Sequence, residues 1–388
     1  MIELQSVWGW QPALYLFLGG MGAGAFVVAA VLYLRCGSKA GKTVAVSAWC
    51  SIVCLAVGLL CLLTELTNPL RGLLLWQSFS NFSSWMTIGA WVLVAALVVF
   101  GVFAVLSTEK TAALVSQAWK GLYAKRHRVL SVLAIVGIVL GIGVAAYTGI
   151  LLMSAPGVPL WNTPLLPFLF TVSGLDTGIA LVEVVSVANA KKEALPSRGH
   201  RLMEKLVVVL VVVEAIVLAV LLTSMHAGGP QVDGGASGSA TAALSADLLT
   251  TGSLAPWFWA LVVACGLAMP LLAALTGLIS HRGKRPAKAV GQAGERSDRG
   301  LEAPDGPRGQ GFADSCDSVK VSSSDAAPRD LESKPAEGKG GGMVLAGAFG
   351  ALVGGCALRF VVVLAGVHAD PVADATAQLF ANMLGRLS

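Results

Sequence analysis

Long apolar stretches alternate with short polar ones along most of this chain. About 20 consecutive apolar residues are enough to cross the hydrocarbon core of a bilayer as a helix. By that criterion the pattern predicts an all-α integral membrane protein with eight crossings. The predicted crossings are residues 13–34, 44–64, 85–107, 130–152, 164–188, 205–225, 256–280 and 343–367.

The composition supports this interpretation. Hydrophobic residues make up 55% of the chain and charged residues 13%, and the mean hydropathy is +0.75. These values exclude a soluble fold. No basic region precedes the first apolar stretch, and no plausible cleavage site follows it, so we expect a retained helix and not a signal peptide.

The charges of the loops predict how the chain is oriented in the membrane. Basic residues gather after the first, third, fifth and seventh crossings, whereas the other loops contain Arg71 as their one base. By the positive-inside rule, the basic loops are cytoplasmic and both termini lie outside. The bases are Arg35, Lys39, Lys42, Lys110, Lys120, Lys125, Arg126, Arg128, Lys191, Lys192, Arg198, Arg201, Lys205, Arg282, Lys284, Arg285 and Lys288.

The stretch 282–342 differs from the rest of the chain. It is rich in Gly, Pro, Ser and charged residues and poor in aromatic and β-branched residues. Such a composition predicts a disordered cytoplasmic loop. It is either a tolerated insertion or a docking segment for a cytoplasmic partner.

The first crossing combines interfacial, small and polar residues. Trp8 and Trp10 suit one membrane interface, and Arg35 suits the other. Gly20 and Gly24 are four residues apart, so a neighbouring helix can approach that face closely. Gln11 and Tyr15 lie one helical turn apart at the outer mouth.

A weak internal repeat relates residues 16–24 to residues 169–178, and both segments begin an outside-to-inside helix. If the two halves are related in this way, two four-helix bundles lie side by side. The alternative is a coincidence between two Gly-rich apolar segments.

Five ionisable residues lie within the crossings or at their rims: Glu65, Asp176, Glu183, Glu214 and Arg359. Charges in lipid are costly unless they are paired or face water, which makes each residue a functional candidate. Asp176 and Glu183 are seven residues apart and share a helix face. With Glu214, they are predicted to form a proton path that has Arg359 as its counter-charge. The alternative is a set of structural ion pairs.

The sequence lacks the residues that usually bind several classes of cofactor. The seven cysteines include no C-x-x-C pair, so the sequence predicts neither an iron–sulfur cluster nor a metal site. The five histidines lie at span ends or in loops, so no haem is expected. Residues 20–25 match a relaxed dinucleotide fingerprint, but they lie inside an apolar crossing, where helix packing explains the glycines better.

Polar and aromatic residues concentrate on the predicted outer side. Tyr147 lies about five residues inside the fourth crossing, near the depth of Tyr15. An apolar pocket with a few hydrogen-bond donors suits a quinone. An ordinary aromatic belt explains each of these residues equally well when it is taken alone.

Several long motifs, in order, resemble the NrfD/polysulfide-reductase membrane subunits, which handle quinol for molybdopterin oxidoreductase complexes. The segment around Arg359, residues 354–366, also looks like the last helix of that family. The other matching motifs are Trp8-Gly-Trp10 with Tyr15-Leu-Phe-Leu-Gly-Gly-Met-Gly-Ala-Gly-Ala-Phe26, Asn68-Pro-Leu-Arg71, Asn81-Phe-Ser-Ser-Trp85-Met86, Tyr147-Thr-Gly149, and Pro159-Leu-Trp161.

The resemblance implies two four-helix bundles, no cofactor in this chain, and a menaquinol site near the outer face of the first bundle. It also implies a four-cluster iron–sulfur partner and a molybdopterin catalytic subunit, at the bacterial cytoplasmic membrane. Tyr147 is the first candidate to bind the quinone, followed by Gln11 and Tyr15. A His or Asn at the start of the first helix is not reproduced, and Glu65 and Arg71 are expected to take part of its role.

The predicted organisation is a first bundle at 1–155, helices five to seven at 156–281, the loop 282–342, and a last helix with its outer tail at 343–388. The expected function is menaquinol oxidation, with electrons passed to the iron–sulfur partner. The alternative is a secondary transporter, which internal repeats and buried charges also fit. Pro270 interrupts the seventh crossing without a counterpart in the third, and this disfavours the transporter.

Overall fold

The computed structural model of the chain is helical nearly throughout. It describes residues 3–4, 9–65, 85–118, 125–155, 157–191, 194–229, 235–282 and 340–368. Within these residues, eight helical spans are long and apolar enough to cross a membrane, which confirms the predicted number of crossings. They are α1 (Trp10–Cys36), α2 (Gly41–Glu65), α4 (Trp85–Ser107), α7 (Arg126–Met153), α8 (Leu165–Asn189), α9 (Ser197–His226), the composite of α11 (Ala255–Trp257), η3 (Phe258–Ala268) and α12 (Met269–Arg282), and α13 (Gly340–Leu364).

Shorter elements occupy some of the predicted loops. The helices α5 (Glu109–Ala118) and α10 (Gly235–Thr250) were not predicted, because neither is apolar and long enough to be a crossing. The 3-10 turn η1 (Gly37–Ala40) joins α1 to α2. Strand β1 (Glu3–Leu4) pairs antiparallel with β2 (Val367–His368), so the two ends of the described chain meet.

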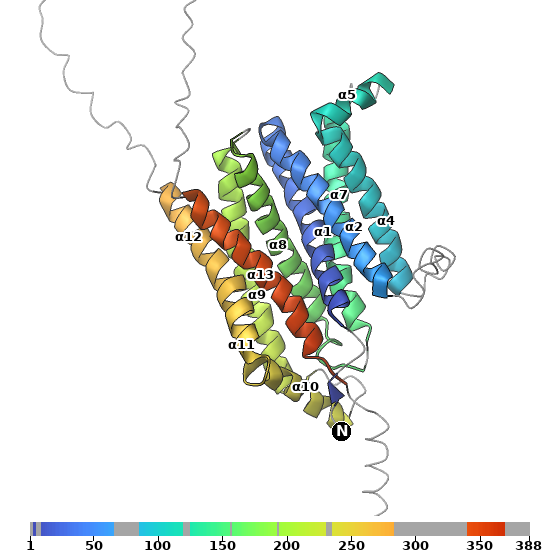
Figure 1. Ribbon diagram of the computed structural model, residues 1–388, viewed down its shortest axis with the longest axis vertical. Coiled ribbons are helices and arrows are strands. Elements are labelled where there is room, and N and C mark those ends of the chain that lie inside the picture. The colour runs from blue at the N-terminus through green and yellow to red at the C-terminus, as the bar shows by residue number, and fades with distance from the viewer. Residues whose placement is uncertain are drawn as a thin grey trace, which may run out of the picture.

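Three spans form the interior of the molecule. In the most apolar windows of α1 and α8, 67% of the residues are buried, and in that of α13 the value is 61%. The other five windows are between 28% and 33% buried. Helix α1 packs against α2, α7, α8 and α13, although α8 and α13 are distant in sequence (Figure 1).

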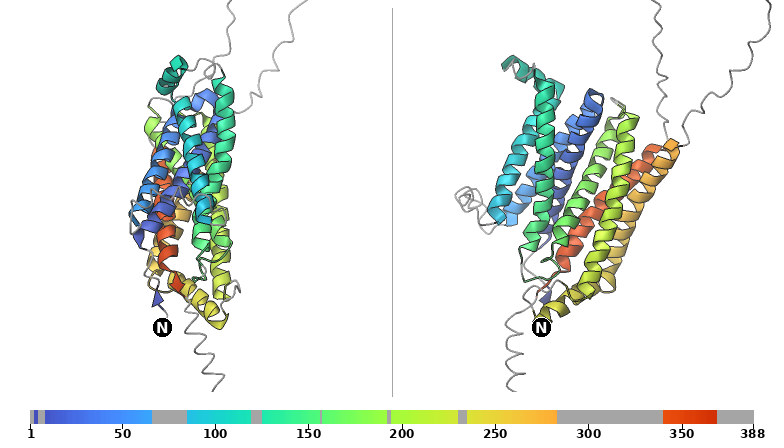
Figure 2. Two further views of the ribbon diagram at one scale, coloured as in Figure 1. Left: turned by 90° about the vertical axis from the view of Figure 1, so that its right-hand side faces the viewer. Right: turned by 180° about the vertical axis from the view of Figure 1, so that it is seen from behind.

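The remaining contacts join the helices into two groups of four, and within each group the contacts form a closed ring. Helices α2 and α7 each pack against both α1 and α4. Beyond α1, helix α8 packs against α9 and α13, and α12 packs against both of these. The three views agree that the spans lie side by side along a common direction (Figures 1 and 2).

Small residues bring α1 and α8 into close contact. A Cβ atom placed on Gly24 would overlap the carbonyl group of Gly174, and one placed on Gly178 would overlap the backbone of Gly24. Gly20 and Gly174 are also neighbours in this crossing, since a Cβ on Gly174 would lie 3.1 Å from the Gly20 oxygen. The two segments of the predicted repeat therefore pack directly on each other, as small residues allow in membrane helices.

Aromatic side chains fill the space between α1, α4 and α7. The rings of Phe26 and Phe100 stack, with their centroids 3.6 Å apart, and Phe103 contacts both Phe26 and Tyr33 edge-on. Gly137 of α7 makes room for this cluster, because a Cβ there would overlap the Phe26 ring.

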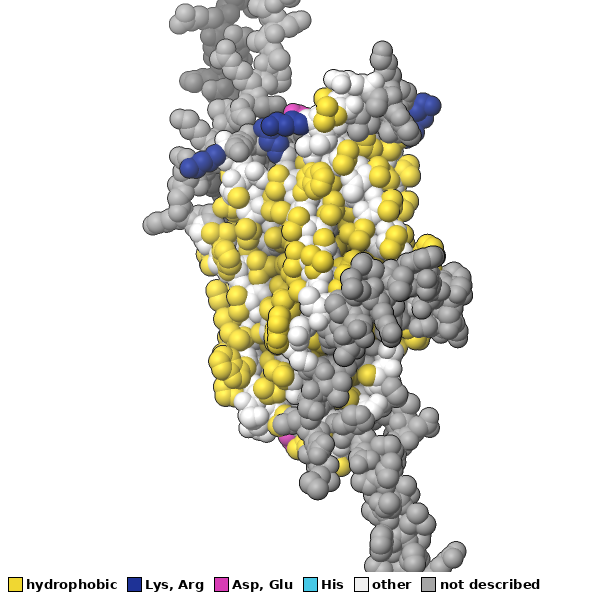
Figure 3. Space-filling view, turned by 45° about the vertical axis from the view of Figure 1, so that its right-hand side comes forward, with side chains coloured by type: hydrophobic (Ala, Val, Ile, Leu, Met, Phe, Trp, Pro, Cys, Tyr) yellow, Lys and Arg dark blue, Asp and Glu magenta, His cyan; other side chains and the backbone are white. Residues whose placement is uncertain are grey.

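The surface separates into an apolar band and a basic end. In Figure 3, hydrophobic side chains cover the length of the helices, and Lys and Arg gather at one end. We call this the basic end; it carries the bases between α1 and α2, those around the start of α7, and those of the turn from α8 to α9. At the opposite end, Trp10, Trp85, Trp257 and Trp259 are exposed, as expected for residues at a membrane interface.

The predicted disordered stretch 282–342 lies almost wholly outside the described residues. Its first residue ends α12, and α13 begins within it at Gly340. The role of this loop is therefore still a prediction.

Candidate functional site

Tyr147 projects from α7 toward α4. Its ring lies against Gly89, where a Cβ atom would overlap the ring. The next residue, Thr148, faces α1 instead: its methyl group lies 3.4 Å from the position that a Cβ on Gly19 would take. Gly89 thus creates the space that Tyr147 occupies between α4 and α7.

Gln11 and Tyr15 lie on the first turns of α1, at the end opposite the basic end, and both are half-buried. Tyr15 packs against an apolar cluster that includes Leu16, Leu152 and Trp161. Tyr147 and Tyr15 therefore face different neighbours, the first toward α4 and the second toward this cluster.

Two further predicted residues are outside what the structure describes. Glu65 is the last residue of α2, and its side chain is not among those described. Arg71 lies in the segment 66–84, which is likewise outside the described residues. Their suggested part in the quinol site stays a prediction.

Arg359 of α13 lies at the junction of α1, α8 and α13, with an exposed fraction of 0%. One terminal nitrogen, Nη1, donates to Ser173 Oγ and to the Gly355 carbonyl oxygen at 3.0 Å. The other, Nη2, donates to the Phe170 carbonyl oxygen at 3.1 Å, and the guanidinium carbon lies 5.0 Å from the centre of the Phe170 ring. Arg359 is thus held by neutral acceptors on α8 and α13.

The predicted carboxylates line two adjoining cavities among α8, α9, α12 and α13. The first has a volume of about 20 Å³, enough for about one water molecule, and is bordered by Asp176, Glu183 and Glu204. The second is bordered by Ser173, Asp176 and Glu214 and is too narrow to hold a water molecule. Asp176 and Glu183 do share one face of α8, as predicted, and Asp176 borders both cavities.

Glu204 was not among the predicted residues, and the structure buries it. The predicted sixth crossing started one residue later, because Arg198, Arg201 and Lys205 make this segment look like a polar loop. Helix α9 instead begins at Ser197. Helical spacing was the available signal, since Glu204 shares the buried face of Val207, Val211, Glu214, Leu218, Leu221 and Met225.

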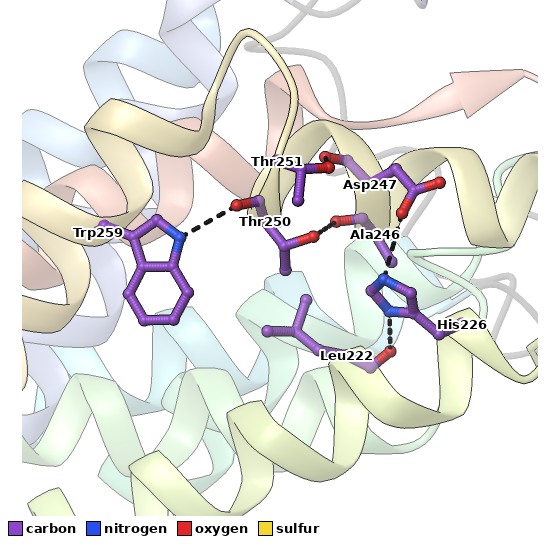
Figure 4. A network of polar contacts seen from close by, with 7 residues as sticks. All are labelled: Leu222, His226, Ala246, Asp247, Thr250, Thr251 and Trp259. Atoms are coloured by element: carbon purple, nitrogen blue, oxygen red, sulfur yellow. Dashed lines mark hydrogen bonds and ion pairs between the residues drawn. The ribbon is translucent and has the colours of Figure 1, made fainter.

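A separate polar network joins α9 to α10 at the end opposite the basic end (Figure 4). His226 Nε2 lies 3.2 Å from Asp247 Oδ1, and its Nδ1 lies 2.9 Å from the Leu222 carbonyl oxygen. Trp259 Nε1 donates to the Thr250 carbonyl oxygen at 3.1 Å. This network anchors α10 to its neighbours, and it contains none of the predicted site residues.

Residues 3–287 match the family described as polysulphide reductase, NrfD. The chain belongs to this NrfD family. It is 34% identical to a polysulfide reductase subunit of Wolinella succinogenes over 278 residues, which cover 69% of this chain and 82% of that protein. It is also 29% identical to Protein NrfD of Escherichia coli over 277 residues, which cover 69% of this chain and 83% of that protein.

The family match ends before α13 begins. Helix α13 nevertheless packs against α1, α8, η3 and α12, and it supplies Arg359 to the interior. The NrfD-family part of the chain therefore packs against one side of a helix that lies beyond the matched region.

Proposed function

We propose that this chain is the quinol-oxidising membrane subunit of a bacterial redox complex. Membership of the NrfD family over residues 3–287 carries this proposal. The name of the Wolinella relative, a subunit of polysulfide reductase, supports assembly with further subunits of a reductase. The eight apolar spans support a multi-pass protein, which we assign to the cytoplasmic membrane.

In this proposal menaquinol is the substrate, and it binds near the end opposite the basic end. Its oxidation releases two electrons and two protons. The electrons pass to a four-cluster iron–sulfur subunit and then to a molybdopterin catalytic subunit. The protons leave through nearby polar groups, for which Glu65 and Arg71 are our candidates. This chain itself needs no haem or cluster for these steps.

Tyr147 is our first candidate for binding the quinol, with Gln11 and Tyr15 next. A phenol can both donate and accept a hydrogen bond, so it can hold either the hydroxyl of a quinol or the carbonyl of a quinone. The position of Tyr147 between two helices supports this role, because Gly89 leaves its ring room there.

The test is Tyr147→Phe in the purified, reconstituted complex. Losing the hydroxyl removes the hydrogen bond and keeps the ring, so we expect quinol oxidation to fall about tenfold, equivalent to about 1.4 kcal/mol. Tyr33→Phe is the matched control, since Tyr33 lies in the Phe103 cluster near the basic end of α1. Unchanged quinol oxidation in Tyr147→Phe would show that this site assignment is wrong.

For the architecture, we propose two four-helix bundles with both termini outside. The ring of contacts through α1, α2, α4 and α7 supports the first bundle, and the ring through α8, α9, α12 and α13 supports the second. The close glycine crossing of α1 and α8 supports a relationship between the halves. The basic end then faces the cytoplasm.

A second proposal concerns protons. The cavities bordered by Asp176, Glu183 and Glu214 support a proton path through the second bundle, with Arg359 as a fixed positive charge beside it. Turnover would then generate a membrane potential. Proteoliposomes in which turnover generates no potential would rule out this proposal.

The secondary transporter is the alternative function. Buried charges also fit a transporter, but family membership favours the redox subunit. Mass spectrometry of what co-purifies in mild detergent separates the two. An iron–sulfur protein with a molybdopterin subunit supports our proposal, whereas substrate flux through the isolated chain favours the transporter.

A further inference from the structure

Helices α4 and α7 pack side by side (Figure 2), and Tyr147 of α7 faces Gly89 near the start of α4. If Gly89 carried a Cβ atom, the three atoms nearest to it would be Cζ, Cε1 and Cε2 of the Tyr147 ring, and all three would overlap it. Cζ is the ring carbon that bears the hydroxyl group. The tip of the ring therefore occupies the space that a side chain on α4 would need at this position.

Further contacts hold α4 and α7 at this spacing. Gly143 lies one turn before Tyr147 on α7, and a Cβ atom there would be 3.5 Å from a methyl group of Val92 on α4. Nearer the basic end, a Cβ atom on Gly141 would lie 3.6 Å from the Phe100 ring of α4. A methyl group added opposite the tyrosine ring is therefore relieved more easily by moving that ring than by separating two helices that pack along several turns.

The backbone of Tyr147 is also fixed by two other helices. Thr148 is buried, and its methyl group lies 3.4 Å from the position that a Cβ atom on Gly19 of α1 would take. A Cβ atom on Gly149 would overlap the backbone of Pro167 in the first turn of α8. The end of α7 thus packs against α1, α4 and α8. The direction of the tyrosine side chain, and not a movement of its backbone, decides where the hydroxyl group lies.

A side chain that forms a hydrogen bond with a substrate has to be placed closely. In active sites, a misplacement of about 1 Å can cost about a hundredfold in rate. An alanine in place of Gly89 would overlap the Tyr147 ring by more than this tolerance. The ring would then have to turn away, and its hydroxyl group would leave its present position.

We propose that Gly89 is a positioning residue of the quinol site. Because it has no side chain, it lets the Tyr147 hydroxyl group lie where the substrate binds. In this proposal Gly89 makes no hydrogen bond with the substrate and acts through Tyr147 alone. The inference rests on the role proposed above for Tyr147, and it adds the residue of α4 on which that role depends.

The contact between the two residues can be tested without quinol, by thermal unfolding of the purified full-length chain. We expect Gly89→Ala to lower the melting temperature by at least about 3 °C, because the added methyl group overpacks the interface. In a Tyr147→Ala background the ring is absent, so we expect Gly89→Ala to lower it by less than about 1 °C. Equal losses in both backgrounds would overturn the inference. If Gly89→Ala alone does not fold, recovery of a folded chain in the double variant supports the inference, and no recovery overturns it.

The positioning role is tested in the reconstituted complex with menadiol, a menaquinol headgroup without the long tail. We expect Gly89→Ala to lower kcat/KM about tenfold, as for Tyr147→Phe, because both changes remove the same hydrogen bond. In a Tyr147→Phe background, we expect Gly89→Ala to lower kcat/KM by less than about twofold, since that hydrogen bond is already lost. A merely structural role would lower kcat/KM by the same factor in both backgrounds, and this result would overturn the inference.

Gly143→Ala is the matched control, because it changes the same pair of helices and its added Cβ makes an ordinary contact with Val92 at 3.5 Å. We expect it to leave kcat/KM unchanged, and a loss as large as that of Gly89→Ala would contradict the role of Gly89. If the wild-type complex oxidises no menadiol, the proposed function fails and the inference falls with it. In an active complex, equal losses in the two backgrounds overturn the inference alone.

Discussion

Arg359 is a fully buried cation, and its neighbours explain how the protein tolerates it. It donates to Ser173, to its own helix at Gly355, and to the Phe170 carbonyl group. Hydrogen bonds made by a charged group are worth more than those between neutral groups. The sequence predicted Arg359 as a counter-charge for carboxylates, and the structure adds that neutral acceptors hold it in place.

Replacing Ser173 by alanine removes one acceptor of this cation. We expect Ser173→Ala to destabilise the protein by about 1.5–3 kcal/mol, the range for hydrogen bonds to charged groups. Thermal unfolding in detergent, followed by size-exclusion chromatography, measures this. Ser224→Ala is the control, since the Ser224 hydroxyl donates to the Leu221 carbonyl of its own helix. Equal melting temperatures for both variants would contradict the prediction.

Gly24 of α1 and Gly101 of α4 differ in how closely other helices approach them. Gly24→Ala places a Cβ against the Gly174 carbonyl group, so we expect overpacking to cost about 1–3 kcal/mol. Gly101→Ala on α4 is the matched control, because apart from the nearby backbone of α4 no described atom lies within 4 Å of its added Cβ. Thermal stability in the same detergent should fall for Gly24→Ala alone.

At the scale of elements, the segment between α7 and α8 is tied to α13. Trp161 Nε1 donates to the Val362 carbonyl oxygen at 2.9 Å, and its ring covers Gly366, where a Cβ would crowd it. This bond joins residues 201 positions apart in the chain. It fixes the end of the last helix beside the entry to α8.

Trp161→Phe keeps most of the ring and removes the donor. Because the Val362 carbonyl is then left without that partner, we expect a loss of about 1–3 kcal/mol. Trp259→Phe should cost less, since Trp259 is exposed and water can replace its bond to Thr250. Chemical denaturation of both variants is the measurement, and a larger loss in Trp259→Phe would refute this ranking.

The boundary predicted for the sixth crossing left Glu204 out, although this residue lies within α9. Counting apolar residues starts the crossing after Glu204, since three bases lie nearby. The helix begins at Ser197, directly after Pro196, so that Glu204 lies within it. Hydropathy does not register this boundary, because the first turns of the helix are polar.

At the scale of the whole molecule, orientation follows from charge. The basic end should be cytoplasmic, and a chain with eight crossings then has both termini outside. We expect a C-terminal alkaline phosphatase fusion to be active and a C-terminal green fluorescent protein fusion to be dark. A fusion placed after Ala118, at the basic end, should give the opposite result. A fluorescent C-terminal fusion would reverse our assignment of the two faces.

The sequence alone determined the number of crossings, the all-helical class and the family resemblance. Each of these depends on local features, namely runs of apolar residues and motifs that can be read in order. The glycine spacing in α1 also indicated a close helix contact, which the structure places against α8.

Tertiary structure alone decided which groups meet. It packed the two glycine segments on each other, gave Arg359 its partners on α8, and brought Glu204 to the same cavity as Asp176 and Glu183. The physical reason is that helical periodicity fixes which residues share a face of one helix. Which face meets which neighbour depends on packing between segments that are far apart in the chain.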